Sequence, residues 1–104
     1  MAREYPRFLY SNPKDTKAKG PFIVHTLFPK ALFKFIPCNS EEYSTENLNK
    51  YLFHYCSYPG GLVMIQDDPN CDAAYKEKLC KDAWKWLMHH AEFQLFMKER
   101  KIIL

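Results

Sequence analysis

Residues 22–36 read FIVHTLFPKALFKFI, and the predicted fold is built around them. The segment FIVHTL at 22–27 is rich in aromatic and β-branched residues, which favour β-strands. ALFKFI at 31–36 has the same character, and residues 28–30 form a short connection that contains a proline. Two such segments joined by a short connection predict an antiparallel β-hairpin.

The second strand of this hairpin carries apolar residues on both of its faces. Since side chains alternate along a strand, Ala31, Phe33 and Phe35 share one face, and Leu32, Lys34 and Ile36 share the other.

Two further stretches have strand character. The apolar run LVMIQ at 62–66 predicts a strand that is buried on both sides. A short strand at 6–10 is a weaker prediction, because Pro6 suits an edge strand or the start of one. Residues 11–21, SNPKDTKAKGP, show no periodicity and predict a flexible basic loop.

Helical signals follow in two places. Ser44 or Thr45 can cap a helix of about 45–57, and apolar residues recur at helical spacing along it. Asp72 can cap a second helix of about 73–99, whose apolar arc is wider than about 200°. The whole chain, 1–104, is therefore predicted to be one α+β domain, a small antiparallel sheet packed against two helices.

The stretch DAWKWLMHHAEF at 82–93 concentrates histidines and tryptophans, but helical geometry separates them. His89 and His90 point about 100° apart on a helix, so they cannot both bind one metal ion. We expect His90 to be buried in the apolar stripe and His89 to be exposed among lysines. The packing of a core helix is the favoured interpretation of this stretch.

Motifs for cofactors and catalysis do not appear in the sequence. The cysteines at 38, 56, 71 and 80 form no C-x-x-C pair, so no structural zinc template fits. Glycine-rich phosphate-binding loops and nucleophile motifs are also missing. We therefore expect no cofactor, no metal site and no catalytic residue, and an enzyme ranks behind the binding functions below.

Sequence features also predict a location. The first residues lack the apolar core of a signal peptide, and no run approaches the ~18–20 apolar residues of a membrane span. We expect a cytoplasmic protein that does not insert in membranes and whose four cysteines are reduced thiols.

The leading functional hypothesis is a small interaction module that binds another protein or its own copy through the C-terminal helix. Its candidate contact residues are Trp84 and Trp86 and the apolar end of the chain, Ile102, Ile103 and Leu104. An apolar tail gains nothing in water, so these last residues are predicted to dock on the sheet or on a neighbour.

The alternative is an accessory nucleic-acid-binding protein. Residues 1–37 hold seven Lys and Arg against two acids, a net charge of +5, although the whole chain carries only +3. Aromatic residues alternate with these basic ones, and such grooves bind single strands. The candidate contacts are Lys14, Lys17, Lys19, Lys30 and Lys34.

Overall fold

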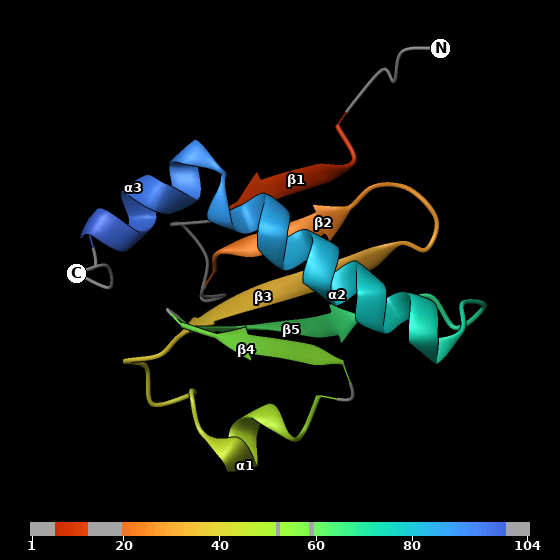
Figure 1. Cartoon of the computed structure of the whole chain (residues 1–104), viewed down its shortest axis with the longest axis horizontal. Helices are drawn as coiled ribbons and strands as arrows, with labels where there is room; N and C mark the ends of the chain where they lie inside the picture. Colours follow the sequence, from red (N-terminus) through yellow and green to blue (C-terminus); the bar gives the residue numbers. More distant parts are fainter. Residues whose placement is uncertain (1–5, 13–19, 52, 59, 100–104) are drawn as a thin grey trace.

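A five-stranded antiparallel sheet organises the computed structural model, which describes residues 6–12, 20–51, 53–58 and 60–99. The strands are β1 (Phe8–Ser11), β2 (Phe22–His25), β3 (Ala31–Pro37), β4 (His54–Ser57) and β5 (Gly60–Gln66). They lie in the order β1-β2-β3-β5-β4 (Figure 1). The helices are α1 (Thr45–Leu48), α2 (Ala73–Met88) and α3 (Ala91–Glu99). The predicted α+β class is confirmed.

The predicted strands are present with nearly the expected bounds. β2 and β3 form the hairpin of 22–36, with Ile23 opposite Phe33 in the register. The strand expected at 62–66 lies within β5, and the weaker N-terminal prediction corresponds to β1 at one edge of the sheet. Of the predicted basic loop at 11–21, Ser11 belongs to β1, and residues 13–19 lie outside the described residues.

The helix predicted at 45–57 is wrong over most of its length. Ser44 does cap it, because its side chain accepts a hydrogen bond from the amide of Asn47, but α1 is a single turn. Residues 54–57 instead form β4, an edge strand paired with β5. Alternating aromatic residues such as Tyr55 suit a strand as well as a helix, and cross-strand pairing with β5 outweighs the helical pattern.

The single helix predicted at 73–99 is also wrong, because it breaks at residues 89–90 into α2 and α3. Asp72 caps α2 as expected, and its carboxylate accepts from the amide of Tyr75 at 2.8 Å. At the break, the side chain of Gln94 donates to the carbonyl of Met88, which would otherwise lack a helical partner. Among the described residues, no helix has the length and the apolar character needed to cross a bilayer.

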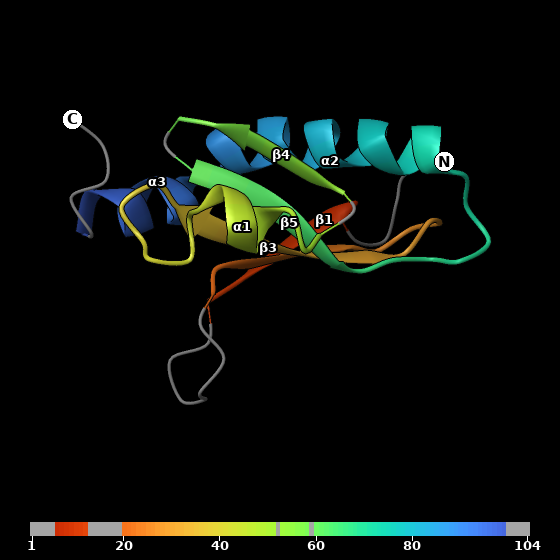
Figure 2. The same cartoon turned by 90° about the horizontal axis from the view of Figure 1, so that it is seen from below.

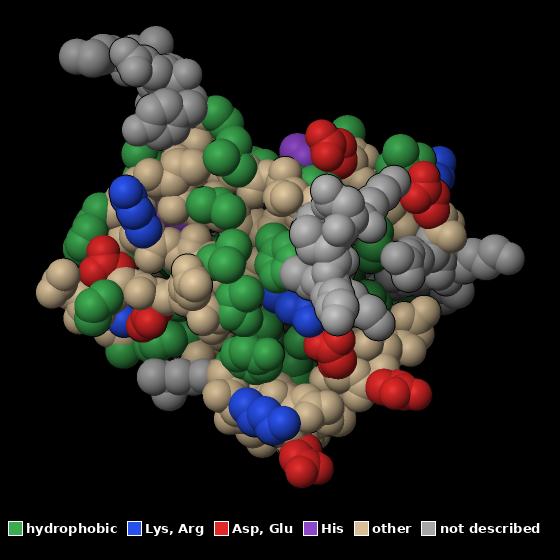
Figure 3. All heavy atoms as spheres, turned by 180° about the vertical axis from the view of Figure 1, so that it is seen from behind, with side chains coloured by type: hydrophobic (Ala, Val, Ile, Leu, Met, Phe, Trp, Pro, Cys, Tyr) green, Lys and Arg blue, Asp and Glu red, His purple; other side chains and the backbone are tan. Residues whose placement is uncertain are grey.

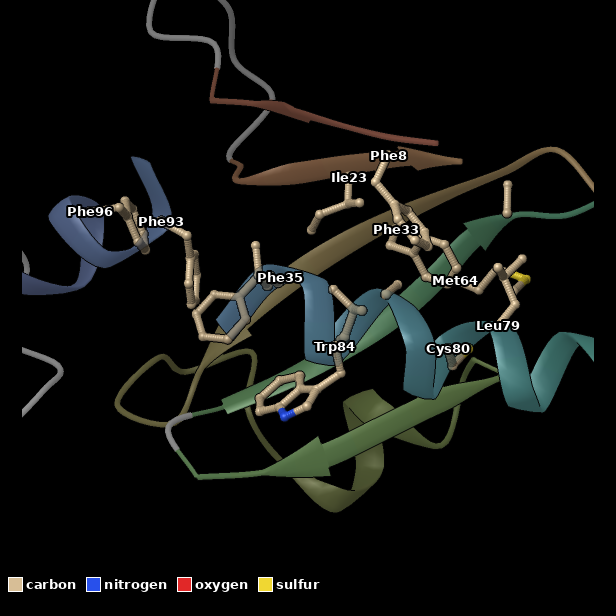
Figure 4. Packing of buried hydrophobic residues seen from close by; sticks show 14 of the residues in the cluster. Phe8, Ile23, Phe33, Phe35, Met64, Leu79, Cys80, Trp84, Phe93 and Phe96 are labelled. Atoms are coloured by element: carbon tan, nitrogen blue, oxygen red, sulfur yellow. The ribbon is translucent and has the colours of Figure 1, made fainter. Parts of the chain in front are cut away.

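Helix α2 lies across one face of the sheet, and Figure 2 shows the two layers edge-on. Ala83, Trp84 and Leu87 are buried between α2 and the strands. Phe35 of β3 joins three elements, because its ring contacts the rings of Trp84 in α2 and of Phe93 and Phe96 in α3 (Figure 4). The break after α2 allows α3 to turn and place these two phenylalanines against the sheet.

Helix α2 carries a buried charged side chain, that of Lys76, near its start. Lys76 is only 7% exposed, and its ammonium lies 2.6 Å from the carboxylate of Asp67 at the end of β5. The ammonium also lies 5.5 Å from the centre of the Phe53 ring. A buried cation needs such partners, so this ion pair fixes the start of α2 relative to the sheet.

Candidate interaction surface

The face of the sheet opposite α2 carries two rows of side chains that follow the strand register. The first row is Leu9, Val24, Leu32 and Gln66, and the second is Ser11, Phe22, Lys34, Val63 and His54. Both rows mix apolar and polar residues. They follow from the sequence because β3 has apolar residues on both faces, as the alternation in ALFKFI predicted.

Part of this face is covered by the segment around α1. Leu48 packs with Ile36 and Val63 in a small second cluster, and Tyr43 and Tyr51 lie against it. Ile36 and Val63 are therefore almost fully buried. The cover lies over β3, β4 and β5 and leaves the residues on β1 and β2 outside it.

Six residues outside this cover are here called the open sheet face: Leu9, Phe22, Val24, Leu32, Lys34 and Ile65. Leu9 is 45% exposed and Ile65 is 37% exposed, while Phe22, Val24 and Leu32 are half-buried. Ile65 lies at a register shift between β3 and β5 and has no direct partner. In Figure 3, which views the molecule from the side opposite α2, hydrophobic side chains form a band across this face. A contiguous apolar patch of this kind is typical of an interaction site.

A shallow hollow of about 440 Å³ lies at one end of the open sheet face. Val24 and Leu32 line it, and Lys30 and Asp67 are exposed beside it. The Asp67 carboxylate is already paired with Lys76, so Lys30 is the unpaired charge there among the described residues. Lys34 is less available to bind a partner, because its ammonium forms an ion pair with the Glu42 carboxylate at 3.0 Å. The open sheet face thus combines protruding apolar residues, an apolar hollow and charges of both signs.

Of the five lysines proposed to contact nucleic acid, the structure describes two. Lys30 is exposed at the start of β3, and Lys34 lies on the open sheet face beside Phe22 in the register. Lys14, Lys17 and Lys19 lie outside the described residues. Their role in binding stays a prediction.

Of the residues proposed for protein contacts, the structure describes Trp84 and Trp86. Trp84 is 7% exposed and packs in the core against Phe35 and Tyr55, so the chain itself covers it. Trp86 is half-buried, and its ring lies 5.5 Å from that of Phe8. Ile102, Ile103 and Leu104 lie outside the described residues, and their docking stays a prediction.

The two adjacent histidines lie in different environments. His89 is exposed as expected, while His90 is half-buried and stacks on Trp86 with ring centres 4.6 Å apart. On its other side, the His90 ring lies 4.9 Å from that of Tyr10. The Nε2 atom of His90 and the hydroxyl of Tyr10 are both buried, and neither has a hydrogen-bond partner among the described residues.

Tyr10→Phe is expected to keep or raise stability at pH 7, by up to about 1 kcal/mol, because it removes a buried hydroxyl that lacks a partner. Burial, followed by the negative charges of Glu92 and Glu99, raises the pKa of Tyr10 to about 12. The folded protein therefore holds this proton up to higher pH than the unfolded chain, and stability falls as the pH rises from about 10 to about 12.

Urea unfolding of both proteins at pH 7 and pH 11 measures this effect. The variant should lose less stability than the wild type between the two pH values. A loss of more than about 1 kcal/mol in the variant at pH 7 would mean that the hydroxyl has a hydrogen-bond partner after all.

All four cysteines, at positions 38, 56, 71 and 80, are free thiols. Burial, with a smaller contribution from Glu77, raises the pKa of Cys80 to about 12, so this thiol stays protonated inside the core. Within the described ranges, no group of three or more metal-binding side chains comes together.

Comparisons with known proteins found no relative. No protein-family model, no curated protein and no solved structure matches the chain.

Proposed function

We propose that this protein is a small non-enzymatic interaction module that associates with a second copy of itself through the open sheet face. The observation that carries the proposal is the apolar row of Leu9, Val24 and Leu32 on the face opposite α2. The apolar arc of α2 gives less support for contact through the C-terminal helix, because its residues are buried against the chain's own sheet.

The open sheet face has the self-complementary features that a two-fold dimer requires. In such a dimer one patch meets its own copy, so a protrusion and a hollow must lie on the same surface. Leu9 and Ile65 are the exposed apolar residues, and the hollow beside Val24 and Leu32 is apolar. Lys30 is exposed beside the hollow and can approach the Asp67 of a second copy across the axis, although that carboxylate is already paired with Lys76.

Sedimentation equilibrium over a range of concentrations tests this proposal. The wild type is expected to dimerise, and Leu9→Asp should weaken dimerisation at least about tenfold, because it places a charge in an apolar contact. Leu95→Asp is the matched control, since Leu95 is a 57% exposed leucine on α3, away from the open sheet face. It should leave the dimer unchanged.

Two outcomes would overturn the proposal. A wild type that stays monomeric at all concentrations would exclude the second copy as the occupant. Equal weakening by Leu9→Asp and Leu95→Asp would show that the contact lies elsewhere. Ile65→Asp provides a second variant on the same face, and circular dichroism establishes that each variant is folded.

Binding of single-stranded nucleic acid is the second candidate function. Its specific support is that Phe22 and Lys34 are neighbours in the register on the open sheet face, where an aromatic ring and a cation can receive a base and a phosphate. The ion pair of Lys34 with Glu42 weighs against it, because it neutralises the cation. Titration of a random oligonucleotide at low ionic strength distinguishes the candidates, since nucleic-acid binding must weaken as salt rises.

A cytoplasmic location is part of this proposal. It rests on the four free thiols, because cysteines of proteins in oxidising compartments are commonly paired in disulfides.

A further inference from the structure

A pocket of about 290 Å³ lies on the other side of the sheet, between the β2–β3 connection and α2. The residues that matter for its chemistry are Arg7, His25, Phe28, Tyr75, Lys78 and Asp82. Tyr75, Lys78 and Asp82 follow one another at spacings of three and four residues, so helical geometry places them on one side of α2. This pocket lies on the other side of the sheet from the open sheet face, and His25 lines both the pocket and the hollow of that face.

His25 holds the guanidinium of Arg7 in place. His25 is only 2% exposed, and its Nδ1 lies 2.6 Å from the carbonyl oxygen of Pro29. A carbonyl can only accept, so Nδ1 carries the proton and Nε2 accepts from Nε of Arg7 at 2.9 Å. His25 is therefore neutral in this arrangement, and it orients Arg7 without cancelling its charge.

The charge of Arg7 is only loosely compensated. Its Nη2 atom lies 3.5 Å from a carboxylate oxygen of Asp82, longer than the ~2.7–2.9 Å of a strong charge-assisted hydrogen bond. Both side chains are about one-third exposed. Lys78 is exposed and forms no ion pair among the described residues. The pocket thus holds two cations and one carboxylate, an excess of positive charge.

Aromatic surface borders these charges. Phe28 is 64% exposed, and Tyr75 is 47% exposed. Large exposed aromatic side chains beside a charged pocket are suited to contact the apolar part of a ligand while cations bind its charged end.

We propose that this pocket binds a small ligand that joins an oxyanion, a carboxylate or a phosphate, to a planar apolar body. Arg7 and Lys78 bind the oxyanion, and Phe28 and Tyr75 contact the ring. Asp82 limits the affinity, because its carboxylate competes for Arg7 and repels the anion. The inference goes beyond the proposed self-association and does not depend on it.

Isothermal titration of the full chain at low ionic strength with phenyl phosphate and with benzoate tests the pocket. Saturable binding of at least one probe is expected, and the tighter probe identifies the oxyanion. Lys78→Gln should weaken binding by about fivefold or more, whereas Asp82→Asn should tighten it, because the two changes alter the pocket's charge in opposite directions.

Two controls separate the site from general charge effects. Lys81→Gln removes an exposed lysine of α2 outside the pocket and should leave the affinity unchanged. Phe28→Ala should weaken binding of phenyl phosphate more than binding of inorganic phosphate, which has no ring. The proposal is overturned if neither probe binds saturably at millimolar concentration, or if Lys78→Gln and Lys81→Gln have equal effects.

Discussion

Phe35→Ala should lower the free energy of unfolding by about 3–5 kcal/mol, the largest effect we expect from a single change in this chain. Phe35 is fully buried, and its ring lies 4.7 Å from that of Phe93 and 6.2 Å from that of Trp84. Truncation removes the burial of a phenyl ring, leaves a cavity and breaks edge-to-face contacts with α3. This one side chain of β3 contacts both α2 and α3. The surrounding structure therefore cannot easily collapse into the cavity that the substitution leaves.

Urea unfolding monitored by circular dichroism measures the loss. The matched control is Leu95→Ala, which truncates a mostly exposed side chain on α3 and should change stability by less than about 0.5 kcal/mol. Should Phe35→Ala cost less than about 1 kcal/mol, α3 would not be packed against the sheet as described.

Gly60→Ala is expected to destabilise the fold by about 3 kcal/mol. The cause is overpacking, in contrast to the cavity that Phe35→Ala leaves. A Cβ atom at Gly60 would clash with the carbonyl oxygen of Ile36 and would lie 2.8 Å from Cζ of Phe35. The first of these contacts is with backbone, which cannot rotate away. Relief therefore requires β3 and β5 to shift apart at the end of their ladder, where Gly60 is opposite Pro37.

The neighbouring glycine supplies the control in the same strand. A Cβ atom at Gly61 would meet Sγ of Cys56 at 3.2 Å, and this side chain can move. Gly61→Ala should therefore cost less than about 1 kcal/mol, the more so since alanine also restricts the unfolded chain. If Gly60→Ala and Gly61→Ala unfold at similar urea concentrations, β3 does not approach Gly60 as closely as described.

The sheet could be predicted because its signals are local. FIVHTL and ALFKFI combine strand-forming residues with a short connection, and LVMIQ is an uninterrupted apolar run. Observed strands β2, β3 and β5 match these segments closely. Ser44 and Asp72 were likewise predictable as helix caps, because a cap depends on residues only a few positions away.

The two helix predictions, at 45–57 and 73–99, were wrong for a different reason. In both places tertiary contacts determine the structure. Residues 54–57 satisfy a helical pattern, but they lie next to β5, and pairing with that strand satisfies their backbone. The break at residues 89–90 allows Phe93 to reach Phe35, a contact between residues distant in sequence. Neither long-range contact is visible in local periodicity.

The candidate contact surface was only partly predictable. The alternation in ALFKFI placed Leu32 and Lys34 together on one face, but the sequence does not state which face the helices cover. Trp84 looked like a contact residue because its size and position on a wide apolar arc are compatible with either burial or binding. The structure places it in the core, and only the three-dimensional arrangement separates these alternatives.

Amide NMR spectra of the wild type over a concentration series test most directly whether the open sheet face is the contact surface. We predict that the signals of Leu9, Val24, Leu32 and Ile65 shift or broaden as the concentration rises, whereas that of Leu95 on α3 stays constant. Spectra that do not change with concentration, or changes confined to α3, would contradict the account.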